Sequence, residues 1–381
     1  MRVSLVDPSA FTPPYDHSLA SALAAAGIEV ELVTSRFLYG SVPPPSGYRV
    51  RESFYRLSAR AGSESRLRLP LKALEHPPQM LAAARRAGRT SDLVHWQWVT
   101  YPPLDRFLIG PSGHPRVLTL HDPLPPTEDA AARRRQRSFL DGFDAVIAHT
   151  AGGAERLRED FGLEPERVHT IPHGPLDYLV DGPVGGREPE LPPELAQGDD
   201  GAPVILFFGL LRPYKGIDTL LEAFAQLDGA ELWIAGMPRM PIEPLRELAR
   251  RAPGTVRILP RFISDHEIPA LLRRAQLLAL PYRELEQSGV LYAGLAFGKP
   301  MVLGDVGGFS EVGREHGVAR LVPPGDSDAL AGALSELLAD PAERERLSRA
   351  ALAAVEGPFS WQGIADRTIA LYESLLTGGR G

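Results

Sequence analysis

Two positive side chains and one helix start in the second half of the chain could hold a diphosphate. Arg212 and Lys215 lie in a turn that follows an apolar run and precedes a helical pattern. Cations at a helix start are disfavoured by the helix dipole, so these two predict a functional reason such as diphosphate binding. Further along, Ser288, Gly289 and Val290 begin another helix. Free backbone N–H groups at that start suit a phosphate, while the alternative for Ser288 is a plain helix cap.

Two acidic residues precede this second helix start. Glu284 and Glu286 could accept hydrogen bonds from ribose or sugar hydroxyls. The helix start at Ser288, together with Arg212 and Lys215, predicts a two-sided diphosphate clamp that uses no metal. No pair of aspartates follows an apolar run in the manner of a magnesium site, because Asp326 and Asp328 fit a helix cap better.

Four histidines in the first half each close a short apolar run: His95, His121, His149 and His173. The carboxyl ends of parallel strands meet at one edge of a sheet, so we expect these side chains near one another. They could contact a polyhydroxylated ligand, bind zinc, or be structural. The close spacing typical of zinc sites is missing. For the set we favour ligand contact, with His121 foremost.

The loop after the first apolar run is rich in proline and lacks the glycine pattern that a dinucleotide needs. Asp16 suits the start of the following helix. Its neighbours Tyr15 and His17 are expected at the same sheet edge as the histidines. With His95 and His149 they are candidates for contact with a second substrate, the acceptor of a transferred group.

Short apolar runs alternate with amphipathic stretches along the whole chain, as in residues 3–7 and 203–209. This rhythm predicts an α/β protein with parallel strands buried on both faces. The segment 181–202 is rich in proline and glycine and has no apolar periodicity, so it predicts a linker. The chain is therefore divided into two doubly wound, Rossmann-like domains, the linker, and a C-terminal helix with its tail: residues 1–180, 203–357, 181–202 and 358–381.

The composition of the chain excludes several classes of protein. The chain has 381 residues, 44% of them hydrophobic and 23% charged, which indicates a globular protein. We find no apolar run long enough for a membrane span, no secretory signal and no cysteine, so we expect a cytoplasmic protein without disulfides. A net charge of −7 argues against nucleic acid as a partner. Only three basic residues are lysines: Lys72, Lys215 and Lys299.

Basic residues gather in residues 49–90, which hold ten basic and three acidic side chains. This charge could attract the phosphates of an acceptor or of an anionic membrane surface, which would allow peripheral contact at the inner membrane face. The alternative, which we favour, is a solvated face of an arginine-rich protein.

The motifs of the second half resemble the family-4 retaining glycosyltransferases, which have the GT-B fold. They occur in the family's order over most of residues 203–330: Gly209 to Gly216, Pro281-Tyr282, Ser288 to Val290, Ala296 to Pro300, Asp305 to Gly308 with Glu311, and Val322 to Asp326. His121-Asp122 and His173-Gly174 match more loosely. The resemblance implies two Rossmann-like domains that face a central cleft, with the last helix crossing back to the first domain.

The resemblance also implies a reaction. A sugar would move from a nucleoside-diphosphate sugar to the hydroxyl of a small-molecule, glycan or lipid-linked acceptor, with retention and without a cofactor. In the family an arginine–lysine pair holds the diphosphate, which here maps to Lys215 and to a displaced Arg212. His121 would orient the transferred sugar. The donor-binding residues would be Glu284, Glu286, Ser288, Gly289, Val290 and His173.

One family residue is missing. A second glutamate, which commonly contacts the donor ribose, falls on Ala293 or Gly294, according to the direction of counting. Nucleotide choice is therefore left open. Two alternatives also stay open: a sugar-nucleotide 2-epimerase or hydrolase on the same fold, and an inactive protein that only binds sugar nucleotides.

Overall fold

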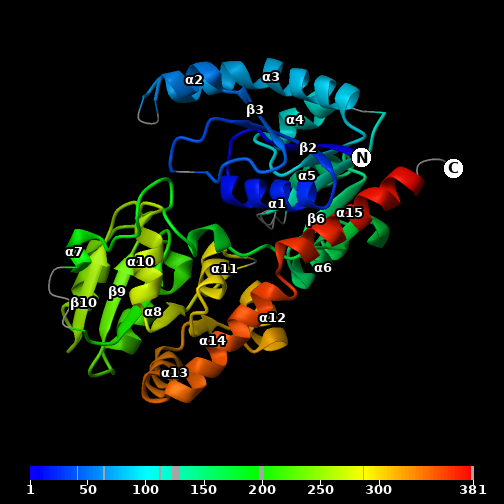
Figure 1. Cartoon of the computed structure of the whole chain (residues 1–381). Coiled ribbons are helices and arrows are strands. Elements are labelled where there is room, and N and C mark those ends of the chain that lie inside the picture. The colour runs from blue at the N-terminus through cyan, green and yellow to red at the C-terminus, as the bar shows by residue number, and fades with distance from the viewer. Residues whose placement is uncertain are drawn as a thin grey trace. The chain divides into compact units, whose positions relative to one another are not determined.

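The chain forms two compact units, seen in the computed structural model of Figure 1. It describes residues 1–40, 42–62, 65–110, 113–121, 129–196, 201–285 and 287–378. Unit 1 comprises residues 1–174 and 360–381, and unit 2 comprises residues 175–359. Each is an α/β layer structure around one parallel sheet, so the predicted pair of Rossmann-like domains is confirmed.

Unit 1 is built on a seven-stranded parallel sheet with the order β3-β2-β1-β4-β5-β6-β7. The order reverses beside β1, and in sheets of this kind ligands bind beyond the strand ends near such a switch. The strands are β1 (Arg2–Asp7), β2 (Glu29–Ser35), β3 (Arg49–Phe54), β4 (Leu93–Trp96), β5 (Arg116–Leu120), β6 (Ala145–Ala148) and β7 (Val168–Thr170).

Two hydrophobic clusters cover the two faces of this sheet. Leu5 of β1 contributes to one cluster and Val6 to the other, because successive side chains of a strand point to opposite faces. The first face is covered by α1 (Pro13–Ala25) and α15 (Trp361–Gly378). The second is covered by α3 (Arg68–Thr90), α4 (Pro102–Ile109), α5 (Ala130–Leu140) and α6 (Ala151–Glu159). The C-terminal helix α15 therefore belongs to unit 1, as the resemblance implies. Short elements join these parts: α2 (Arg56–Arg60) and the 3₁₀ helix η1 (Pro165–Arg167).

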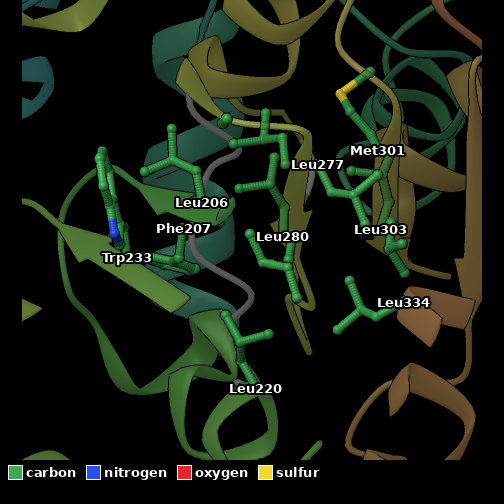
Figure 2. Packing of buried hydrophobic residues seen from close by; sticks show 14 of the residues in the cluster. Leu206, Phe207, Leu220, Trp233, Leu277, Leu280, Met301, Leu303 and Leu334 are labelled. Carbon is green, nitrogen blue, oxygen red and sulfur yellow. The ribbon is translucent and has the colours of Figure 1, made fainter. Parts of the chain in front are cut away.

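Unit 2 has a six-stranded parallel sheet with the order β10-β9-β8-β11-β12-β13. Here the order reverses between β8 and β11. The strands are β8 (Val204–Phe208), β9 (Glu231–Ala235), β10 (Thr255–Leu259), β11 (Leu277–Leu280), β12 (Met301–Gly304) and β13 (Ala319–Val322). Figure 2 shows side chains from four of these strands gathered with Leu220 and Leu334 in one buried core.

Helices enclose the sheet of unit 2. They are α8 (Ile217–Phe224), α9 (Glu243–Ala249), α10 (Glu267–Arg274), α11 (Gly289–Ala296), α12 (Gly307–His316), α13 (Ser327–Ala339) and α14 (Pro341–Glu356), with the 3₁₀ helices η2 (Asp177–Leu179) and η3 (Pro213–Lys215). The residues 181–202, predicted as a linker, pack on this unit where they are described. Leu195 of α7 (Pro193–Ala196) is buried in its core, and Glu194 forms an ion pair with Arg261.

In the part of the chain that the structure describes, none of the helices is both long enough and apolar enough to cross a membrane.

Candidate functional site

Lys215 lies at the end of η3, directly after strand β8 and at the switch point of the unit 2 sheet. The next residue, Gly216, has φ +65° and turns the chain into α8. A Cβ atom there would lie 2.1 Å from the carbonyl oxygen of Pro281, so only glycine fits this turn. The ammonium group of Lys215 lies 4.7 Å from the centre of the Tyr282 ring. The turn therefore aims a lysine inward, toward the loop that follows β11.

The ammonium group of Lys215 is a buried cation without a counterion among the described residues. Only 7% of the residue is exposed. Burial, with a further contribution from Arg212, lowers the pKa of Lys215 to about 8. A buried charge without a partner is costly, so a protein keeps one where an anion is to be bound. Arg212 itself is exposed at the surface of the same turn.

A cavity of about 430 Å³ surrounds this lysine, and it is lined by residues of unit 2 alone. Gly209 and Gly236 form one wall, and a Cβ atom on Gly236 would lie 1.8 Å from the carbonyl oxygen of Gly209. The opposite wall is the start of α11. Ser288 is its N-cap residue but makes no side-chain capping bond. The first N–H groups of α11, on Gly289 and Val290, have no partner within the helix, so they are free to bind an anion.

Gln287 was not predicted, yet it belongs to this cavity. Its side-chain oxygen is buried and has no hydrogen-bond partner within the described part of the chain. A buried polar atom without a partner is rare in folded proteins, and one that lines a cavity can be completed by a ligand or by water. A single glutamine in a polar loop carries no sequence signal that could have singled it out.

The missing glutamate has a place in this cavity. Of the two positions obtained by counting, Ala293 is buried and lines the cavity. Gly294 faces the core instead, where a Cβ atom would lie 2.8 Å from both Leu278 and Met301. A carboxylate that reached the cavity from α11 would therefore stand at position 293, where this chain has a methyl group.

The two predicted acidic residues do not complete this site in the described structure. Glu284 is exposed and does not line the cavity. Glu286 lies outside the described residues. A different acid, Asp265, lines the cavity together with Tyr178.

Three of the four strand-end histidines meet in unit 1, around Tyr15. The ring centres of His121 and His149 are 4.9 Å apart, and those of His149 and His173 are 5.4 Å apart. The ring of Tyr15 lies 4.8 Å from both His121 and His173, and the indole of Trp98 stacks on His121 at 5.2 Å. The structure thus brings these side chains together, as parallel strand ends predict. It also places His173, predicted as a donor contact, in this cluster and not in the cavity of unit 2.

The hydrogen bonds fix the protons of this cluster. Nδ1 of His149 donates to the carbonyl oxygen of Ile171 at 2.9 Å, so Nε2 of the same ring is an acceptor. Nε2 of His149 lies 3.2 Å from Nδ1 of His121, which must then donate to it. Nε2 of His121 is left as an acceptor 3.0 Å from the side-chain amide of Gln97, whose NH2 group satisfies it when turned toward the ring. Both nitrogens of His121 therefore have protein partners.

These histidines are held neutral. Burial lowers the pKa of His149 to about 4 and that of His173 to about 3. Burial, with the nearby His149, also lowers the pKa of His121 well below its ordinary value. At neutral pH the cluster is an uncharged hydrogen-bonding surface and no source of protons.

The remaining two acceptor-side histidines lie apart from the cluster centre. His95 is buried, and its ring nitrogens lie 2.6 Å from the Tyr372 hydroxyl and 2.7 Å from the Thr119 hydroxyl, so it joins α15 to the sheet. His17 contacts the Tyr48 hydroxyl at 2.5 Å and lines a second, larger cavity in unit 1.

Within the described residues, no group of three or more histidine, aspartate or glutamate side chains is placed so that it could hold a metal ion. The zinc interpretation of the histidine set therefore finds no support in the described geometry.

The comparisons with known proteins cover both units. Residues 14–174 match the glycosyl transferase 4-like domain, and residues 202–340 match the group 1 glycosyl transferases. The chain is also 34% identical to the phosphatidyl-myo-inositol mannosyltransferase of Mycobacterium leprae, over 100% of this chain and 98% of that protein. The chain belongs to the group 1 glycosyltransferases.

As a group 1 glycosyltransferase it is a transferase enzyme, and other relatives agree. A D-inositol 3-phosphate glycosyltransferase of Kineococcus radiotolerans is 28% identical, over 94% of this chain and 89% of the relative. Among solved structures, Anabaena HepE in complex with UDP matches with a TM-score of 0.70 and 19% identity, over 98% of this chain and 100% of that one. The structural likeness supports the GT-B fold of this glycosyltransferase.

Proposed function

We propose that the protein transfers a sugar from a nucleoside-diphosphate sugar with retention of configuration and without a metal. The observation that carries this proposal is Lys215, a buried cation without a counterion among the described residues, beside the free N–H groups of α11. A diphosphate is the ligand that supplies the missing negative charge to both. The cavity volume of about 430 Å³ also lies in the range of small-ligand sites.

The chemistry of the step follows from this arrangement. The bond between the anomeric carbon and the β-phosphate oxygen breaks, and negative charge develops on the leaving diphosphate. Lys215 and the N–H groups of Gly289 and Val290 would stabilise that charge. The acceptor oxygen bonds to the anomeric carbon on the face that the phosphate leaves, and its proton passes to the departing phosphate oxygen. No side-chain base is then needed.

The nucleoside would occupy the apolar part of the same cavity. Leu176, Tyr178 and Leu285 line it there, with the Asp265 carboxylate as a polar partner for hydroxyls. HepE, a structural neighbour, is known in complex with UDP, and this likeness supports a nucleoside diphosphate as ligand without identifying the base. Because Ala293 offers no carboxylate to the ribose, Gln287 and Asp265 are the candidates for that contact.

In unit 1, the neutral histidine cluster would hold the transferred sugar. His121 can bind a sugar hydroxyl only if the hydroxyl replaces Gln97 as the partner of Nε2, because its Nδ1 is committed to His149. An uncharged ring suits this task, since a hydroxyl can donate to it without a charge being buried.

The basic segment 49–90 supports peripheral membrane contact as part of this proposal. Leu69 and Leu74 of α3 are each 74% exposed, on a helix that also carries Arg85 and Arg86. Apolar side chains among cations are typical of helices that lie on anionic lipid surfaces.

Product analysis tests the proposal and separates it from its alternatives. The enzyme is incubated with a panel of nucleotide sugars, with EDTA present, and products are followed by NMR. We expect a nucleoside diphosphate and a glycoside with the donor's anomeric configuration. An epimerised nucleotide sugar, or free sugar in the presence of acceptors, would favour the epimerase or hydrolase. Tight donor binding without any turnover would favour the inactive binding protein.

A further inference from the structure

Unit 1 holds a cavity of about 870 Å³ over the carboxyl ends of β2 and β3, and the donor chemistry above does not use it. Its polar lining includes Asp16, Arg36, Glu52 and Arg60. A small pocket of about 20 Å³ shares Arg36 with it and continues to Arg68 and Lys72 of α3. The larger cavity has the volume of a small-ligand site, while the small pocket has room for about one atom the size of a water oxygen, such as one oxygen of a larger ligand.

Lys72, the lysine to which the sequence assigned no task, is a half-buried cation beside this small pocket. Its ammonium group donates to the Ser9 hydroxyl at 2.9 Å and lies 4.5 Å from the centre of the Tyr55 ring. Burial and the nearby Arg68 lower the pKa of Lys72. Arg68 donates to the Tyr39 hydroxyl.

Most cations at the two cavities lack an ion pair among the described residues. No carboxylate of the described residues forms an ion pair with any of four of them: Arg36, Arg60, Arg68 and Lys72. Arg51, which also lines the larger cavity, differs from them because it is paired with Glu31 at 3.0 Å. The two cavities together therefore hold four cations that form no ion pair within the described part of the chain.

Backbone strain is concentrated at the same place. Among the described residues other than glycine, only Ala10 and Tyr55 have positive φ, at 48° and 54°. Ala10 lines the large cavity and Tyr55 the small one. Tyr55 is held there by its own hydrogen bonds, since its N–H donates to Gln79 at 2.7 Å and its hydroxyl lies 2.6 Å from Nδ1 of His76. Strain that the surroundings enforce in this way is typical of ligand sites.

A carboxyl group faces the large cavity with one oxygen unused. Oδ1 of Asp16 is buried and has no hydrogen-bond partner among the residues that the structure describes. The neighbouring Asp7 accepts backbone N–H groups from Ser9 at 3.1 Å and Phe11 at 2.6 Å, so it is the better site for negative charge. Asp16 therefore keeps its proton and offers the cavity a neutral carboxyl, which can exchange hydrogen bonds with a ligand hydroxyl.

We propose that the two cavities together form the acceptor site, and that the acceptor is a polyol carrying a phosphate. The phosphate would bind Lys72, Arg68 and Arg36, and the hydroxyls would face Asp16. A phosphate carries nearly two negative charges as a monoester and offers several acceptor oxygens, which a lysine and two guanidinium groups match better than they match a carboxylate. This inference rests on the proposed function for its acceptor role, whereas the phosphate site itself does not.

The three lysines make a direct test possible. Lysine labelled with ¹³C at Cε gives three side-chain signals in the intact protein, assigned with the variants K72M, K215M and K299M. We expect myo-inositol 1-phosphate to shift the Lys72 signal, while myo-inositol does not. We expect a nucleoside diphosphate to shift the Lys215 signal. If the polyol phosphate leaves the Lys72 signal unmoved, the acceptor inference is overturned. If the diphosphate leaves the Lys215 signal unmoved, the proposed function fails instead.

Calorimetric titration with myo-inositol 1-phosphate measures how much Lys72 contributes to binding. Loss of one charge-assisted contact predicts binding at least tenfold weaker in K72M, with K72R restoring most of it. The matched control is R85Q, which removes an exposed cation from the same helix and should bind as the unmodified protein does. Equal binding by K72M and R85Q would overturn the inference.

The phosphate could belong to a soluble compound or to a lipid headgroup, and vesicles distinguish the two. Vesicles of phosphatidylcholine with phosphatidylinositol are compared with phosphatidylcholine alone in sedimentation. If the source is a lipid, K72M sediments with the inositol lipid at least tenfold less well than R85Q. If it is soluble, the two variants sediment alike, although K72M still fails to bind the soluble phosphate.

Discussion

Replacement of Lys215 by methionine should make the unliganded protein more stable and its ligand binding weaker. Burial lowers the pKa of Lys215 from 10.5 to about 8. At about 1.4 kcal/mol per pKa unit, the folded protein loses about 3 kcal/mol by holding the charged form at neutral pH. Methionine fills a similar volume without a charge. The lost contact with the Tyr282 ring offsets part of the gain, so we expect a net stabilisation of about 1–2 kcal/mol.

The sign of the pH dependence follows from the lowered pKa. The unfolded chain holds the lysine proton up to about pH 10.5, and the folded chain releases it above about 8. The unmodified protein therefore becomes more stable as pH rises from 8 to 10.5, and the advantage of K215M fades over that window. Thermal unfolding measures this directly, with a shift of about 2–4 °C per kcal/mol for a unit of this size.

A nucleoside diphosphate should make the unmodified protein more stable than K215M, which reverses the order expected without ligand. A ligand at a hundred times its Kd stabilises by about 2.7 kcal/mol, while loss of the charge-assisted contact weakens binding by about 10- to 100-fold. The matched control is K299M. Lys299 is also held with its pKa lowered to about 8, yet its ammonium donates to the carbonyl oxygen of Ala275 at 2.9 Å, away from the cavity. K299M should therefore keep the ligand response, because it removes a buried lysine without removing the cation of the cavity.

The reasoning is refuted if K215M unfolds at a lower temperature than the unmodified protein at pH 7 without ligand. It is equally refuted if the diphosphate raises the melting temperatures of both proteins by the same amount.

Three further predictions follow from the titrating groups of unit 1. Because the folded pKa of His149 is lowered from 6.5 to about 4, stability should fall by up to about 3 kcal/mol as pH drops through that window, and H149Q should flatten this part of a melting curve recorded against pH. The raised pKa of Asp16 has the opposite effect, because the folded protein loses stability as pH rises above 4. D16N should therefore become more stable relative to the unmodified protein over that range, and a stability difference that stays constant between pH 4 and 8 would count against this. H121A should lower kcat more than donor affinity, and the reverse pattern in steady-state kinetics would remove His121 from the transferred sugar.

Apolar runs of buried parallel strands were enough to predict the α/β class and both sheets. Strand β3 was missed, because its sequence from Arg49 to Phe54 is mostly polar. It lies at the sheet edge, where Arg51 reaches Glu31 on the neighbouring strand at 3.0 Å. An edge strand with one solvated side has no continuous apolar run to recognise.

The parts of the candidate donor site that come directly after strand ends in the sequence could be predicted. Lys215 and the start of α11 come together because parallel strands end at one edge of the sheet. Gln287 could not be predicted, since its significance is an oxygen left without a partner in the folded chain. Glu284 was predicted as a sugar contact, but it is exposed and does not line the cavity. The direction of a side chain in a loop depends on the local backbone conformation, which the sequence does not reveal.

The most direct measurement for the central claim is the anomeric configuration of the product in the presence of EDTA. The donor is a nucleotide sugar of defined α configuration and the acceptor is myo-inositol 1-phosphate, with the early time course followed by NMR. The account predicts an α-glycoside and one nucleoside diphosphate per turnover, both reduced about a hundredfold in K215M. A β-glycoside, or turnover that stops with EDTA and returns with Mg²⁺, would contradict it.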